Sequence, residues 1–350
     1  MKKTFLFILT WIIISVPAFK AIAAEGVIST GSQPQISADN KGVIRVVFGG
    51  KDSIFCATST NQGASFSKPV LVGHVANMHL GMSRGPQLAS SANYSVITAM
   101  DKSGNIHWFR LSHASSKWKQ MGVVNDITRS APEGLMGIAA DKKDNFYAVW
   151  LDTRIGQHNQ VYFSKLMAKS AAWSKNILAY QSPDGHVCEC CKPNIAVNDN
   201  GVAIMFRNWL KGSRDLYVTR SADGGKIFQP AQKLGAGTWP LNGCPMDGGG
   251  VVIDGADKIH TAWQRQGDIF YVQPGGSETL IGKGRNCTIT AAGTETIISF
   301  QDNDMLKVVS VADKNAIMVG KGAFLKSILL GGNKMLCVWE QDNTIKFKKI

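Results

Sequence analysis

The chain has 350 residues, 44% hydrophobic and 18% charged, a composition typical of a folded globular protein that excludes disorder, collagen and coiled coil. Its mean hydropathy is close to zero and it has one long apolar run, at the N-terminus, which excludes a multi-pass membrane protein. The formal net charge of +13 would suit an acidic partner, but the lysines are scattered, so most of the excess is expected on a solvated surface.

The N-terminal residues 1–24 have the three parts of a secretory signal: two lysines, an apolar stretch from Phe5 to Phe19, and an Ala-Ile-Ala-Ala cleavage site. The apolar stretch is about 15 residues long, shorter than the roughly 20 needed to cross a bilayer. We therefore predict cleavage, an exported periplasmic or extracellular protein, and no stable membrane insertion. The mature chain, 25–350, is expected to be a single domain, and export makes nucleic acid the weakest of the acidic partners.

One pattern returns along the mature chain: an apolar strand, a turn of Asp, Asn or Gly, a second apolar strand, a polar loop, and a third strand. The first strands of six copies begin at Pro34, Pro86, Met136, Pro193, Gly249 and Cys287. Their second strands are expected at Val43–Phe48, Ser95–Met100, Phe146–Trp150, Ala203–Phe206, Ile259–Trp263 and Thr296–Phe300. A seventh, shorter copy has strands at Ser327–Gly331, Met335–Trp339 and Thr344–Ile350.

Short alternating strands without a helical period predict an all-β protein. Copies spaced by about 36 to 57 residues, with four strands each, predict the blades of a β-propeller. The seventh copy has room for three strands, so we expect Gly26–Thr30 to add the fourth and close the ring. Seven blades are favoured, and six are the alternative if two weak C-terminal copies share one blade.

Two segments, Ser59–Phe66 and Ser221–Phe228, share the pattern Ser-x-Asp/Asn-x-Gly-x-x-Phe. The Asp or Asn caps its own turn, and the Gly supplies positive φ. This pattern resembles the Asp-box, or BNR repeat, of the sialidase (neuraminidase) superfamily. The stretch from about Arg84 to Arg265, with its Cys-x-Cys-Cys loop, also resembles a subgroup of bacterial sialidase-like proteins. The resemblance implies a sialidase-like propeller whose Asp-box turns lie on the face opposite the site.

In a propeller, the loops between blades and the loops between second and third strands emerge together around the central channel. Long inter-blade loops precede blades two to five, so we expect a lopsided site there. A planar guanidinium matches two acidic oxygens, and sialidases bind their substrate through an Arg triad. The candidates for binding an acidic ligand are Arg84, Arg154, Arg207, Arg214, Arg265, Asp247 and Trp239. Alternatively, ion pairs such as Arg154 with Asp152 fix the loops.

Glu133 and Asp152 are the candidate general acid and base, although loop carboxylates also cap turns or pair with arginine. If the protein is an enzyme, the resemblance implies an exo-sialidase-like glycoside hydrolase that requires no cofactor. Two departures from the family argue against that chemistry. The mature chain lacks an early Phe/Tyr-Arg-Ile-Pro, and no tyrosine follows Tyr271 to act as the usual nucleophile.

The cysteines form a second set of candidates, because Cys188, Cys190 and Cys191 precede blade four and Cys244 precedes blade five. In an exported protein, disulfides are one interpretation. The other is a soft-metal site for Cu or Zn. The remaining cysteines fall in or beside strands and are expected to be buried as small apolar residues: Cys56, Cys287 and Cys337.

The sequence therefore leaves three functions open. The first is binding, with or without hydrolysis, of an acidic glycan or another small anion at the channel. The second is a soft-metal or redox-sensitive binding protein that uses the Cys-x-Cys-Cys loop. The third is a noncatalytic interaction scaffold.

Overall fold

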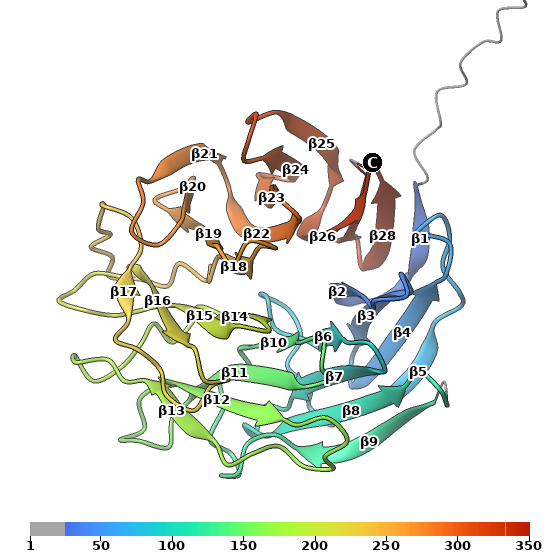
Figure 1. Cartoon of the computed structure of the whole chain (residues 1–350), viewed down its shortest axis with the longest axis horizontal. Helices are drawn as coiled ribbons and strands as arrows, with labels where there is room; N and C mark the ends of the chain where they lie inside the picture. The colour runs from blue at the N-terminus through green and yellow to red at the C-terminus, as the bar shows by residue number, and fades with distance from the viewer. Residues whose placement is uncertain (1–24, 116, 333) are drawn as a thin grey trace, which may run out of the picture.

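A computed structural model describes residues 25–115, 117–332 and 334–350, so the predicted secretory signal lies outside the described residues. Within these ranges the regular elements are all β-strands, and no helix that could cross a membrane is found there. The strands form seven antiparallel sheets of four strands each, arranged as blades around a ring (Figure 1). The prediction of a seven-bladed β-propeller is confirmed.

In the first six blades, four consecutive strands run from the channel to the rim. Blade one contains β2 (Ser32–Ala38), β3 (Ile44–Gly50), β4 (Ser53–Ser59) and β5 (Val70–His74). Blade two contains β6 (Gln87–Ser90), β7 (Tyr94–Met100), β8 (Ile106–Ser112) and β9 (Trp118–Val123). Blade three contains β10 (Met136–Ala140), β11 (Phe146–Asp152), β12 (Gln160–Leu166) and β13 (Ile177–Tyr180). Blade four contains β14 (Asn194–Asn198), β15 (Gly201–Arg207), β16 (Leu216–Ser221) and β17 (Gln232–Lys233). Blade five contains β18 (Gly250–Ile253), β19 (Ile259–Arg265), β20 (Asp268–Val272) and β21 (Thr279–Lys283). Blade six contains β22 (Arg285–Ala292), β23 (Glu295–Asp302), β24 (Met305–Ser310) and β25 (Ala316–Lys321).

The seventh blade joins the two ends of the described chain. Three of its strands are C-terminal, β26 (Ala323–Gly331), β27 (Lys334–Gln341) and β28 (Thr344–Lys349), and the outermost is β1 (Glu25–Thr30). Strand β1 pairs antiparallel with β28, placing Glu25 opposite Lys348 and Thr30 opposite Thr344. The ring is therefore closed by backbone hydrogen bonds, as the sequence predicted.

The core lies between neighbouring blades, because each sheet covers the faces of the sheets on either side. The second strand of each blade is the most deeply buried, and most of these strands carry a large aromatic residue with almost no exposed surface: Phe48, Trp150, Phe206, Trp263, Phe300 and Trp339. One buried cluster, for example, joins Trp108 of blade two to Phe146 and Trp150 of blade three. This packing makes a frame on which the loops are positioned.

The two Ser-x-Asp/Asn-x-Gly turns connect the third and fourth strands of blades one and four. In the second turn, Asp223 Oδ1 accepts hydrogen bonds from the backbone N–H groups of Lys226 and Ile227, while Ser221 Oγ accepts one from Gly225. The first turn repeats this scheme around Ser59. The aromatic residue that ends each turn packs edge-on against a ring of an adjacent blade, Phe228 on Phe163 and Phe66 on Phe347.

Replacing Gly225 by alanine tests how tightly this turn packs. Gly225 has a φ of +92°, and an added Cβ would overlap the Phe163 ring, whereas Gly42, with a φ of +76°, has open space around it. We expect Gly42→Ala to cost about 1 kcal/mol for its left-handed backbone. Gly225→Ala should cost about 1–3 kcal/mol more, because the ring must move. Urea unfolding measures both, and equal costs would contradict the described packing.

Candidate functional site

The candidate residues gather at one end of the channel. Because neighbouring strands are antiparallel, the inter-blade loops share an end of the ring with the loops between second and third strands; we call it the loop face. The turns between first and second strands lie at the other end, the turn face. All the residues that the sequence singled out as ligand groups lie on or just below the loop face.

Arg154 and Asp152 hold each other inside the protein. Arg154 donates to Asp152 through Nε at 2.9 Å and Nη2 at 2.8 Å, and to Asp126 through Nη1 at 2.7 Å. Asp152 has no exposed surface and also accepts hydrogen bonds from Ser130 Oγ and Trp150 Nε1. The buried carboxylate has no room for a substrate. Asp152 therefore fixes the loop through its ion pair with Arg154 and is not placed to act as a general base.

Two further arginines are also engaged by the protein. Arg207 is 1% exposed and donates to the backbone carbonyls of Asp247, Arg214 and Gln264. Arg265 forms a two-pronged pair with Glu278, at 2.8 and 2.5 Å. These guanidinium groups fix loops, and they are not free to form a clamp around an anion.

Asp247 and Trp239, which the sequence offered as ligand-binding residues beside the arginines, have structural contacts as well. Both carboxylate oxygens of Asp247 accept backbone N–H groups, from Gly249 at 3.0 Å and Asn286 at 2.7 Å. The Trp239 ring lies over the Arg207 guanidinium, 5.4 Å from ring centroid to Cζ. Both residues thus support the loop that precedes blade five.

Arg84 and Glu133 lie in a cavity of about 600 Å³ on the loop face. Arg84 Nε donates to the Glu133 carbonyl at 2.5 Å, Nη2 lies 3.7 Å from the Glu133 carboxylate, and Nη1 has no partner among the described residues. Burial raises the pKa of Glu133, and the Arg84 charge offsets part of that rise. Two lysines also line the cavity, Lys51 and Lys102. This is the part of the predicted glycan site that retains free polar groups.

The structure brings the three loop cysteines together. The sulfurs of Cys188, Cys190 and Cys191 all lie within 4.8 Å of one another, with Cys188 3.8 Å from Cys190 and 3.3 Å from Cys191. None of the seven cysteines forms a disulfide in the structure, since a disulfide would need about 2.05 Å between sulfurs. Cys188 and Cys191 are buried, and Cys190 is partly exposed. Of the other four, Cys56, Cys287 and Cys337 are buried, as predicted, and Cys244 is exposed.

Arg214 places a positive charge on this cluster. Its Nη1 donates to Cys188 Sγ at 3.0 Å, and its guanidinium lies over the Trp209 ring at 4.6 Å. Hydrogen bonding with the Cys190 and Cys191 sulfurs, together with the Arg214 charge, lowers the pKa of Cys188 far below its usual value. The hydrogen bond to Cys188 raises the pKa of Cys190 to about 12, and burial raises that of Cys191. Among the three cysteines, the thiolate form is therefore favoured most at Cys188.

The surroundings of the cluster offer further ligand groups. The exposed Cys244 interacts with Cys190 and contributes to its raised pKa. The His186 ring stacks between those of His158 and Trp209, 5.8 Å from each. The loop before blade four thus joins a buried sulfur set to an imidazole stack at the surface.

Sequence reasoning missed two lysines that line the channel itself. Lys192 precedes β14 and Lys326 lies on β26, and both face a central cavity of about 210 Å³. Their signal in the sequence is a lysine at the start of, or within, the first strand of a blade. Only the closed ring shows that these strands surround one channel.

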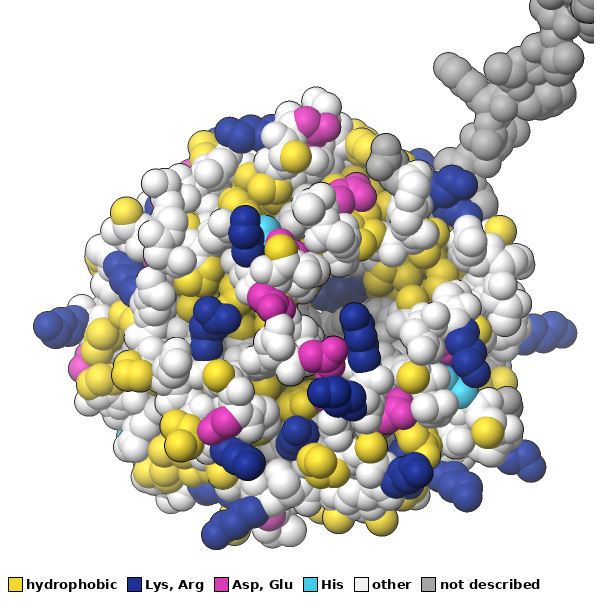
Figure 2. All heavy atoms as spheres, in the orientation of Figure 1, with side chains coloured by type: hydrophobic (Ala, Val, Ile, Leu, Met, Phe, Trp, Pro, Cys, Tyr) yellow, Lys and Arg dark blue, Asp and Glu magenta, His cyan; other side chains and the backbone are white. Residues whose placement is uncertain are grey.

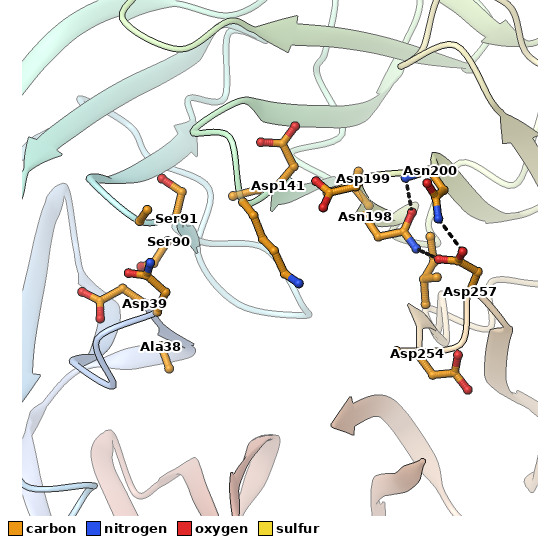
Figure 3. Close-up of a pocket in the computed structure, with 17 residues that line it drawn as sticks. Ala38, Asp39, Ser90, Ser91, Asp141, Asn198, Asp199, Asn200, Asp254 and Asp257 are labelled. Atoms are coloured by element: carbon orange, nitrogen blue, oxygen red, sulfur yellow. Dashed lines mark hydrogen bonds between the residues drawn. The ribbon is translucent and has the colours of Figure 1, made fainter. Parts of the chain in front are cut away.

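The turn face carries a basin of about 660 Å³ lined by acidic residues (Figure 3). Asp39, Asp141 and Asp254 each accept two backbone N–H groups of their own turn through one carboxylate oxygen. The second oxygen binds a side chain six residues later, from Arg45, Tyr147 and His260 respectively. These carboxylates shape repeated turns, and no candidate from the sequence lies here.

No family model and no curated protein sequence matches the chain. The lectin BP39L from Burkholderia pseudomallei has a similar structure, with TM-score 0.70 and 11% identity over 91% of this chain and 96% of its own. An ulvan lyase from a polysaccharide lyase family gives 0.61 and 10% over 93% and 94%, and the SapL1 lectin, bound to alpha methyl fucoside, 0.55 and 11% over 85% and 98%. At these identities the likeness shows the propeller fold alone, and the sialidase resemblance stays a prediction.

The opposite environments of Asp152 and Glu133 give a stability test. Asp152→Asn removes the charge that faces Arg154 in the buried pair, so we expect it to cost about 3 kcal/mol or more. Glu133→Gln changes a carboxylate that is 33% exposed and 3.7 Å from Arg84, and should cost less than about 1 kcal/mol. Chemical denaturation measures both. A small cost for Asp152→Asn would argue against its structural role and reopen a catalytic one.

Proposed function

We propose that this protein binds a soft metal ion, Cu(I) or Zn(II), through Cys188, Cys190 and Cys191 on the loop face. The single observation that carries the proposal is the mutual approach of the three sulfurs. Thiolates bound to zinc at about 2.3 Å lie about 3.8 Å apart, and the Cys188–Cys190 distance is 3.8 Å. Soft thiolate ligands select Cu(I) and Zn over magnesium, calcium or manganese.

The charges around the cluster fit a cation. The neighbouring sulfurs and Arg214 lower the pKa of Cys188, and Arg214 offsets the negative charge that further deprotonation would add. Backbone hydrogen bonds from Val187 to Asn159 and from Cys188 to Arg207 tie the loop to blades three and four, each at 2.9 Å. Three thiolates would satisfy Cu(I). Zn(II) favours four ligands, for which Cys244 is the nearest thiol.

Metal titration of the reduced protein tests the proposal. We expect one Cu(I) per chain, with affinity lost in Cys188→Ser and Cys191→Ser but kept in Cys244→Ser, the matched control outside the buried set. Zn(II) affinity should fall in Cys244→Ser as well. Binding should weaken as the pH is lowered, because the Cys190 and Cys191 protons must leave.

Two outcomes would contradict the proposal. One is the absence of stoichiometric metal under reducing conditions. The other is a disulfide among these cysteines, shown by mass spectrometry of the unreduced native protein, which would support the disulfide alternative. Circular dichroism of each variant checks that the fold is kept.

A second candidate is carbohydrate binding in the cavity around Arg84 and Glu133. The observation in its favour is a cavity of about 600 Å³ that is lined by Arg84, Glu133 and two lysines. The lyase and lectins of similar structure add fold-level support only. A sialidase-like hydrolysis has less support, because Arg154, Arg207 and Arg265 are engaged by the protein.

A panel of sialosides and sulfated or uronate-containing glycans tests this candidate. If this candidate is right, Arg84→Ala should abolish glycan binding. Arg220→Ala, at an exposed residue of β16 in blade four, should leave glycan binding unchanged. Binding without turnover would support a carbohydrate-binding role. Failure of every glycan to bind would reject the candidate without affecting the metal proposal.

A further inference from the structure

One cavity of the central channel has two lysines and no acidic residue among the described residues that line it. The cavity of about 210 Å³ is lined by the first strands of the blades, including the polar side chains of Gln87, Asn194, Thr288 and Ser327. Among the described residues that line it, Lys192 and Lys326 are the charged ones. The space-filling view shows the ring hollowed at its centre, with both basic and acidic side chains around the hollow (Figure 2).

The two lysines also meet at a narrower space toward the loop face. A second cavity, of about 30 Å³, is lined by both lysines together with Asn194, Thr288 and Asp247. The lysines come from blades four and seven, so the ring, and not a single loop, brings them to one place.

The charge of these lysines is poorly balanced by the protein. Lys192 Nζ donates to the neutral Gln87 Oε1 at 2.6 Å, and neither lysine forms an ion pair within the described residues. Asp247 is the one carboxylate nearby, but both of its oxygens accept backbone N–H groups, and the buried Arg207 lies beside it. Among the described residues, no free carboxylate balances these lysines, and burial lowers the pKa of Lys192 well below its usual value.

Burial of cations without a counter-charge is costly, and a bound anion removes much of that cost. An oxyanion offers several acceptor oxygens, which match the two ammonium groups and the Thr288 hydroxyl, whose contact with the Leu325 carbonyl is long at 3.4 Å. Burial lowers the pKa of Lys326 to about 8, so a nearby negative charge would also favour its protonated form.

We propose that Lys192 and Lys326 form a binding site for a small oxyanion, a sulfate or a carboxylate, inside the channel. The site is separate from the metal site, although Lys192 directly follows Cys191 in the chain. It does not depend on the metal proposal, and each can fail alone. The anion could be free in solution or carried by an acidic sugar, and the test below distinguishes these sources.

Thermal unfolding of the chain from residue 25 to residue 350 tests the site. The midpoint of unfolding is measured in sodium sulfate and compared with that in sodium chloride of equal ionic strength. Sulfate should raise the midpoint of unfolding in a saturable way that chloride does not reproduce. The apparent sulfate affinity should fall at least about tenfold in Lys326→Met and stay within about threefold in Lys326→Arg. Lys283→Met, at a side chain that is 83% exposed, is the matched control and should bind sulfate as the unmodified protein does.

Two further arms identify the source of the anion. Stabilisation by acetate and sulfate but not by glucuronate indicates a free ion, whereas stabilisation by glucuronate but not by glucose indicates an acidic sugar; either supports the site. If Lys326→Met does not fold, Thr288→Val removes one hydroxyl at constant charge and should weaken sulfate binding at least about threefold. Equal effects of sulfate and chloride, or unchanged sulfate binding in the folded Lys326 or Thr288 variants, would overturn the proposal.

Discussion

Pairing of β1 with β28 is the constraint on which the rest of the structure depends. An open row of sheets would leave β28 as an exposed edge and would let the first and seventh blades separate. The pairing removes that freedom, and the interlocked aromatic residues between blades then fix the distances across the ring. Residues as far apart in sequence as Lys192 and Lys326 consequently line one channel.

The buried charges of the loop face divide into two groups with different physical roles. Arg154, Arg207 and Arg265 have their donors satisfied by carboxylates and carbonyls of the protein, so they stabilise the loops. The thiol cluster and the channel lysines are only partly compensated, and they retain capacity for a ligand. A cation suits the first of these sites and an anion the second, because each would complete a local charge balance.

Much of the fold could be predicted, because alternating apolar residues and turn residues return in each blade. The pattern placed β3, β7 and β11 within two residues of their observed ends, and the shortage of strands in the last copy predicted the closure by β1. The cysteine cluster could also be predicted from the sequence, because its three thiols lie within four consecutive residues. Short-range chemistry of this kind is visible in a sequence.

The hydrogen-bond partners of the arginines could not be predicted in the same way. Arg207 donates to carbonyls 40 and 57 residues away, and a backbone acceptor leaves no signature in the sequence. Glu278, which pairs with Arg265, lies in an ordinary polar loop 13 residues further on. The place of each channel lysine in or beside the first strand of a blade can be read from the sequence, but their meeting cannot, because the channel exists only after all seven blades have met.

X-ray absorption spectroscopy of the metal-loaded protein tests the central claim, that the loop before blade four holds a metal through sulfur, most directly. The account predicts that the zinc spectrum is fitted by sulfur neighbours at about 2.3 Å and that three of them belong to the Cys-x-Cys-Cys loop, so that a triple serine variant of this loop loses the sulfur signal. A spectrum dominated by nitrogen and oxygen neighbours, or one left unchanged by the triple substitution, would contradict it.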